Sequence, residues 1–121
     1  MIDRDLVLDG LAELADSVHQ EQAWAGPDSG ARDAFAACTR KLFDDSGLSA
    51  ALGPVWFFGR GRPFRPVVFS RKIDIALRML RTLTKIIGDR PLGDLLDDPR
   101  LQGCRQSATW ILEQLRLQPA S

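Results

Sequence analysis

The sequence predicts a mainly α-helical fold, a bundle of four to five helices with one short β-hairpin or extended loop around residues 55–69. Three observations support this prediction. Apolar residues recur at spacings of three and four along most of the chain, which places them on one face of a helix. Capping residues, glycines and prolines separate these segments. The length of 121 residues is that of a single domain, covering 1–121.

The first helix is expected over residues 4–22, because its apolar residues follow the spacing i, i+4, i+7 and i+11. An aspartate before this segment can cap its first turn. Residues 24–30 contain glycine and proline and therefore predict a loop. Trp24 lies in this loop and is the aromatic residue that we expect to be most exposed, whereas Trp56 and Trp110 are expected in the core.

A second helix is expected over residues 31–45, with Ser29 as its cap. Gly47 suits the left-handed position that ends a helix, and a short helical turn over 48–52 follows it. The predicted buried stripe of the second helix consists of Ala31, Phe35, Cys38 and Leu42.

Residues 55–69 differ in character from the helical segments. Two runs of β-branched and aromatic residues, 55–58 and 67–69, flank a stretch rich in glycine, proline and arginine. This pattern is typical of a β-hairpin. Prolines restrict the second strand to an edge position, so an extended apolar loop is the alternative.

A third helix is expected over residues 71–87, capped by Ser70 and ended by Gly88. Its predicted buried face consists of Ile73, Leu77, Leu80, Thr84 and Ile87, with cations on much of the remaining surface. Residues 91–97 can form a short helix.

Asp98 followed by Pro99 is a good start for the last helix, which we expect to reach residue 117. Its predicted inward residues are Leu101, Cys104, Ala108, Ile111, Leu112 and Leu115.

The formal net charge of zero hides a segregation along the chain. Residues 1–50 hold ten carboxylates and four cations, a net charge of −6, and residues 51–121 hold twelve cations and six carboxylates, a net charge of +6. Most of the positive charge lies in 60–85. Such asymmetry indicates a charged partner. The alternative is that the two halves face and neutralise one another in the fold.

The sequence has no run of 18 apolar residues, so we expect no membrane span and no membrane partner. The acidic N-terminus is the opposite of a signal peptide, which predicts a cytoplasmic protein. In that compartment Cys38 and Cys104 stay reduced, and their place on apolar helix faces predicts small buried hydrophobic residues.

Residues for catalysis are scarce. His19 is the only histidine, and its place near the end of the first expected helix predicts a solvated side chain. The acidic pairs 44–45 and 97–98 lie at helix boundaries, where capping explains them better than metal binding. Phosphate-binding glycine motifs are absent. We therefore expect no enzyme, no cofactor and no metal site.

One functional alternative is nucleic-acid binding through the basic segment 60–85. The tetrapeptide Arg60-Gly61-Arg62-Pro63 resembles the core of the AT-hook, whose arginines lie in the narrow minor groove of A·T-rich DNA. The candidate residues for this function are Arg60, Arg62, Arg65, Arg71, Lys72 and Arg78.

The favoured alternative is a protein partner with a basic surface that meets the acidic N-terminal helices. In overall character, a small, helical, charge-segregated chain without catalytic residues, the protein resembles bacterial toxin-immunity proteins of the contact-dependent growth inhibition type. The resemblance implies a non-enzymatic antitoxin that binds its cognate toxin, which could be a nuclease. The partner-binding residues are then expected to be Asp9, Glu13, Asp16, Trp24, Asp44 and Asp45. A structural subunit of a larger assembly is the third alternative.

Overall fold

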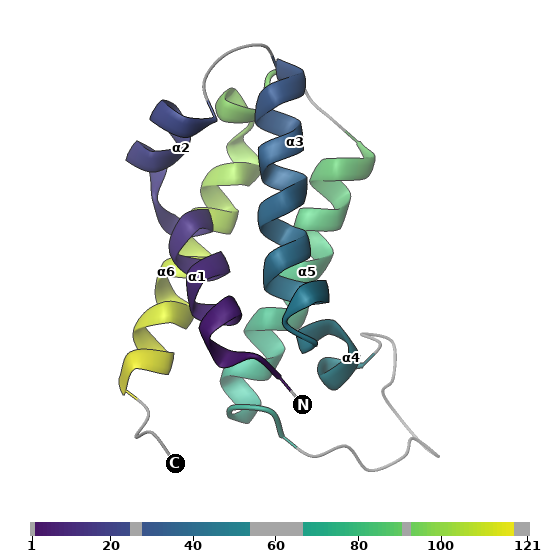
Figure 1. The fold of residues 1–121 in the computed structure, drawn as a ribbon, viewed down its shortest axis with the longest axis vertical. Coiled ribbons are helices and arrows are strands. Elements are labelled where there is room, and N and C mark those ends of the chain that lie inside the picture. Colours follow the sequence, from purple (N-terminus) through teal and green to yellow (C-terminus); the bar gives the residue numbers. More distant parts are fainter. Residues whose placement is uncertain (1, 25–27, 54–66, 91–92, 118–121) are drawn as a thin grey trace.

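The computed structural model describes residues 2–24, 28–53, 67–90 and 93–117 (Figure 1). These residues form six α-helices, which are α1 (Arg4–Ala15), α2 (Ser17–Ala23), α3 (Asp28–Thr39), α4 (Leu48–Leu52), α5 (Arg71–Asp89) and α6 (Pro99–Leu117). A π-helical segment η1 (Arg40–Asp45) continues α3, and a 3₁₀ turn η2 (Leu95–Asp97) precedes α6. The mainly α-helical prediction is therefore confirmed, with more helices than the four or five expected.

The predicted hairpin is not supported by the part of the chain that the structure describes. Residues 54–66, which hold most of it and Trp56, lie outside the described residues. Residues 67–69 are described and form no strand. The backbone N–H groups of Val68 and Phe69 instead donate to the buried carboxylate of Asp74, at 2.8 and 3.0 Å. These two hydrogen bonds hold the segment before α5 against the first turn of that helix.

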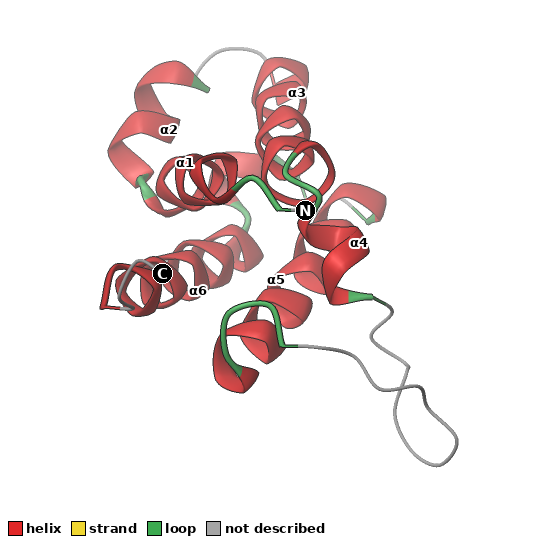
Figure 2. Cartoon of the chain, turned by 60° about the horizontal axis from the view of Figure 1, so that its bottom comes forward, coloured by secondary structure: helices red, strands yellow, loops and turns green. Residues whose placement is uncertain are grey.

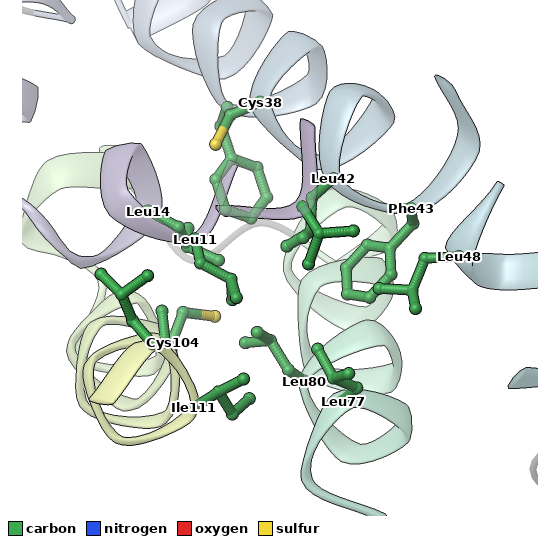
Figure 3. Close-up of a cluster of buried hydrophobic side chains, with 14 of the residues drawn as sticks. Leu11, Leu14, Cys38, Leu42, Phe43, Leu48, Leu77, Leu80, Cys104 and Ile111 are labelled. Atoms are coloured by element: carbon green, nitrogen blue, oxygen red, sulfur yellow. The ribbon is translucent and has the colours of Figure 1, made fainter. Parts of the chain in front are cut away.

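The helices pack around one core (Figures 1 and 2). Helix α1 lies along α6, α5 also packs on α6, and η1 packs on α1. Figure 3 shows Leu11 and Leu14 of α1 meeting Leu42 of η1, together with side chains of α5 and α6. All the predicted inward residues of the second, third and last helices are buried. The helical periodicity thus predicted the core residues of these segments correctly.

The expected single helix over 4–22 is wrong, because the chain breaks at Asp16 into α1 and α2. Asp16 has extended backbone (φ −92°, ψ 96°), and its side chain accepts the backbone N–H of His19 at 2.9 Å. His19 therefore lies exposed in the first turn of α2 rather than near the C-terminal end of a helix. The buried Gln20 stabilises the break, since its amide Nε2 donates to the carbonyls of Glu13 and Leu14 at 3.1 and 2.7 Å.

The expected exposures of two tryptophans are reversed in the structure. Trp24 follows α2 and is only 2% exposed, whereas Trp110 on α6 is 40% exposed. The Trp24 ring meets Phe35 edge-on, with ring centroids 6.2 Å apart, and its indole Nε1 donates to Glu13 Oε2 at 3.3 Å. The residue that follows α2, Trp24, therefore packs against Phe35 of α3.

The helix boundaries agree with the caps in most places. Ser70 accepts the N–H of Ile73 at 3.1 Å, and Gly47 has the expected left-handed φ of 80°. Helix α3 begins at Asp28, so the predicted cap Ser29 lies inside it. Gly88 does not end its helix, since α5 continues to Asp89. Within the described part of 91–97, only the 3₁₀ turn η2 forms.

Candidate functional site

Helix α1 and η1 run past each other in close contact, and this crossing positions the N-terminal carboxylates. A Cβ atom at Gly10 would lie 2.7 Å from the Cβ of Leu42, so only glycine allows this approach. The N–H of Asp3 donates to the carbonyl of Ser46 at 2.8 Å, and Cys38 Sγ lies 3.5 Å from the carbonyl of Gly10. The first turns of α1 therefore lie beside the end of η1.

Four exposed carboxylates lie on these two crossing elements, and we call them the acidic surface. It consists of Asp5 and Asp9 on α1 and Asp44 and Asp45 on η1. Asp5 and Asp9 are one helical turn apart, on the side of α1 opposite its buried residues. The Cα positions are fixed because both elements are anchored in the core through their apolar faces.

The acidic surface ends at an ion pair. Lys41 Nζ lies 2.9 Å from Glu13 Oε1, and this hydrogen bond is the main reason that the pKa of Lys41 is raised, although burial opposes it. The charge of Asp9 also raises the pKa of Lys41, which places Asp9 near this ammonium group.

The six predicted partner-binding residues have two different environments. Asp9, Asp44 and Asp45 are exposed, as a contact role requires. Glu13 is partly buried and binds Lys41 and Trp24, while Asp16 caps α2. Trp24 is buried, so the expectation that it is an exposed contact residue is wrong.

The predicted basic residues are also divided. Arg60, Arg62 and Arg65 lie outside the described residues, whereas Arg71 and Lys72 are exposed in the first turn of α5.

Arg78 and Arg81 have structural roles at the end of α4. Arg78 donates from Nε and Nη2 to the carbonyl of Leu52, at 3.2 and 2.6 Å. Arg81 donates to the carbonyls of Ser49 and Gly53 and to the Ser49 hydroxyl. Cations suit carbonyls at the C-terminal end of a helix. The sequence interpretation treated this positive charge as free surface, and half-burial of both arginines shows otherwise.

A groove of ≈ 1030 Å³ lies between the α3–η1 segment and α5, and the sequence interpretation did not identify it. Four cations line it (Arg40, Arg81, Lys85 and Arg90), against two carboxylates (Asp44 and Asp89). Its apolar lining comes from Ala36, Phe43 and Ile86. Burial, together with the neighbouring charge of Arg78, lowers the pKa of Arg81. The excess of cations over carboxylates in the lining favours an anion.

An exposed apolar stripe on α5 leads into this groove. Ile75, Met79 and Ile86 are 53, 66 and 43% exposed, and Thr82 fills the remaining position of the spacing i, i+4, i+7, i+11. Thr82 and Ile86 also line the groove. The same spacing is visible in the sequence, on the face of the helix opposite the buried one.

The charge segregation of the sequence reaches the molecular surface. The ion pairs Lys41–Glu13 and Arg100–Asp98 each join residues of the same half. Asp5, Asp9, Asp44 and Asp45 are exposed on α1 and η1, beside one exposed cation, Arg40, and the exposed cations Arg71, Lys72 and Lys85 lie on α5.

Both cysteines lie in environments that disfavour the reactive thiolate. Cys38 and Cys104 are buried, and burial raises the pKa of each thiol to about 12. Within residues 2–24, 28–53, 67–90 and 93–117, no group of three His, Cys, Asp or Glu side chains could hold a metal ion. No described helix is both long and apolar enough to cross a bilayer.

Comparisons of the chain with protein-family models, with curated proteins and with solved structures gave no match.

Proposed function

We propose that the protein is a non-enzymatic binding module whose acidic surface docks on a basic surface of another protein. The observation that carries this proposal is the exposure of four carboxylates on two elements that cross in close contact. A site on rigid elements keeps its charges in position without the entropic cost of ordering a loop.

The electrostatics of this surface favour a basic partner. Exposed carboxylates attract a cationic surface over a distance of about one Debye length, ~8–10 Å at physiological salt. Opposite potentials speed association and disfavour partners of the wrong charge. Lys41 does not offset the four carboxylates, because its charge is paired with Glu13.

The most concrete form of the proposal is an immunity protein, an antitoxin that neutralises a cognate cytoplasmic toxin. A nuclease is a suitable toxin, because an active site that holds phosphates is basic. An acidic surface would occupy the same positive field and block access of the nucleic acid. The proposal thus joins the overall resemblance of the chain to a specific set of residues, Asp5, Asp9, Asp44 and Asp45.

The alternative, nucleic-acid binding through 60–85, has less support from the described residues. Arg78, one of its candidate residues, donates to the last turn of α4 and is half-buried. Arg71 and Lys72 are exposed but lie together at one end of α5. Steep salt dependence of binding to DNA or RNA would favour this alternative.

A growth-protection experiment tests the proposal. The toxin whose reading frame the proposal expects immediately upstream of this chain's own is expressed from an inducible promoter. It is combined with the wild-type chain, the variant Asp9→Lys/Asp45→Lys or the variant Asp33→Lys/Asp97→Lys. The last variant is a matched control, because it changes the same number of exposed aspartates outside the acidic surface. We expect protection by wild type and control, and loss of protection with the surface variant. Equal protection by all three would contradict the assigned surface.

A further inference from the structure

The groove between α3–η1 and α5 is a second candidate interaction surface, which shares only Asp44 with the acidic surface proposed above. It combines three features: an apolar lining, a cationic rim and an exposed apolar stripe that leads into it. Scattered exposed apolar residues are normal on a protein surface. Three large ones on one face of one helix, beside a groove, indicate a binding surface instead.

The geometry of the apolar stripe fits a helix. Ile75 and Ile86 are eleven residues apart, which is ~16 Å along a helix axis. The exposed side chains at i, i+4 and i+11, with Thr82 at i+7, present the pattern that an amphipathic helix uses to meet a partner helix. Helices α3 and α5 lie side by side (Figure 1), so an added helix over this groove would continue the bundle.

The charges that line the groove favour an occupant of negative charge. Arg40, Lys85 and Arg90 line it, and among described side chains none of them takes part in an ion pair. Half-buried Arg81 adds a cation whose hydrogen bonds go to uncharged oxygens of Ser49 and Gly53. Charge complementarity therefore favours carboxylates on the occupant.

We infer that this groove binds an acidic amphipathic helix of a partner protein. The apolar side chains of that helix would pack on Met79, Ile86 and the apolar lining of the groove. Its carboxylates would pair with Lys85, Arg90 and Arg40. Protein rather than nucleic acid is favoured, because the stripe offers aliphatic side chains that bury apolar surface, and no described aromatic ring is exposed along it for base stacking.

The experiment uses the full-length ¹⁵N-labelled chain and a synthetic helical peptide of about 16 residues, with leucines at i, i+4, i+7 and i+11 and glutamates beside them. One control peptide has lysines in place of the glutamates, and a second has the same composition in scrambled order. We expect the acidic peptide to shift the amide resonances of residues 36–44 and 79–90. We expect the control peptides to bind at least about tenfold more weakly.

Variants assign the peptide to the groove. Lys85→Glu/Arg90→Glu and Ile86→Ser should each weaken binding of the acidic peptide at least about tenfold. The charge-matched control Lys72→Glu/Arg116→Glu, which changes two exposed cations outside the groove lining, should leave binding unchanged. Asp9→Lys should also leave it unchanged, so failure here and failure of the proposed function are distinguishable.

Three results would overturn the inference. The first is the absence of shifts at the groove amides with the acidic peptide. The second is equal binding of the acidic and lysine peptides. The third is a shift of the groove amide resonances on addition of a short DNA duplex but not of the acidic peptide. That result would assign the groove to nucleic acid.

Discussion

Gly10 of α1 lies against Leu42 of η1 so closely that an added Cβ would stand 2.7 Å from Leu42 Cβ and 3.0 Å from its Cα. Neither atom is the flexible end of a side chain, so the helices would have to separate. We expect Gly10→Ala to lower the free energy of unfolding by about 1–3 kcal/mol, the cost of overpacking. Chemical denaturation measures this change.

The control for this prediction is Gly103→Ala in α6. A Cβ there would make an ordinary contact at 3.5 Å with Leu83 Cδ2. Alanine is favoured over glycine inside a helix, so this variant should gain about 0.5–1 kcal/mol. Stabilisation of both variants would contradict the close contact between α1 and η1 that positions the acidic surface.

Trp24 and Trp110 should differ greatly in their contribution to stability. Because Trp24 is 2% exposed and packs on Phe35, Trp24→Ala should cost about 3–5 kcal/mol. Trp110 is 40% exposed, so Trp110→Ala should cost less than about 1 kcal/mol. Urea unfolding of the two variants checks the order, and a larger loss for Trp110→Ala would contradict it.

The carboxylate of Asp74 should stabilise the segment before α5. It accepts two backbone N–H groups, those of Val68 and Phe69. Asp74→Asn keeps the shape but leaves only one oxygen acceptor, so we expect a loss of about 1–3 kcal/mol. Hydrogen exchange at the two amides should also accelerate.

Asp89→Asn, a change at an exposed aspartate of the same helix, is the control for Asp74→Asn and should be neutral or slightly stabilising at the C-terminal end of α5. Unchanged exchange at residues 68 and 69 in Asp74→Asn would contradict the role of this carboxylate.

The buried thiols predict a loss of stability in alkaline solution. Burial raises the pKa of Cys38 and Cys104 from 9.0 to about 12, so the folded state holds protons that the unfolded state releases. Their contribution is complete below pH 9.0 and decreases as the pH rises from 9.0 toward 12. Denaturation at about pH 8 and about pH 10.5 should show this decrease in the wild type.

The matched variant for this pH dependence is Cys38→Ala/Cys104→Ala. It should be less stable at neutral pH, because each substitution removes a buried sulfur atom. Its stability should change less between the two pH values. The chain contains no tyrosine, so the remaining alkaline dependence comes from other groups such as the paired Lys41. Identical pH dependence in the variant and the wild type would exclude the thiols as its source.

The helical periodicity predicted most of the core, because burial on one face depends on the local spacing of apolar residues. It failed where a polar residue decides the backbone. Asp16 can either continue a helix or cap the next one, and the choice depends on Gln20. Gln20 Oε1 also accepts a hydrogen bond from Nε of Arg105 on α6, at 2.7 Å. A contact across 85 residues is not visible in a local pattern.

The candidate site was also predicted only in part, because local spacing indicates exposure but not tertiary contacts. The exposed positions of Asp9, Asp44 and Asp45 follow from the helix pattern, and the structure confirms their exposure. Other environments depend on tertiary contacts that the pattern does not contain. Glu13 pairs with Lys41, Trp24 packs on Phe35, and Arg78 donates to the carbonyl of Leu52. The groove between α3–η1 and α5 depends on how two distant helices pack, so the sequence pattern alone could not place its lining residues together.

The most direct measurement of the central claim is quantitative mass spectrometry of proteins captured from the native host by three forms of the chain. These forms are the wild type, Asp9→Lys/Asp45→Lys and the matched control Asp33→Lys/Asp97→Lys. We predict that one protein with a basic domain is captured by the wild type and the control, and at least about tenfold less by the acidic-surface variant. Equal capture of the same protein by all three forms would contradict the claim that the acidic surface binds the partner.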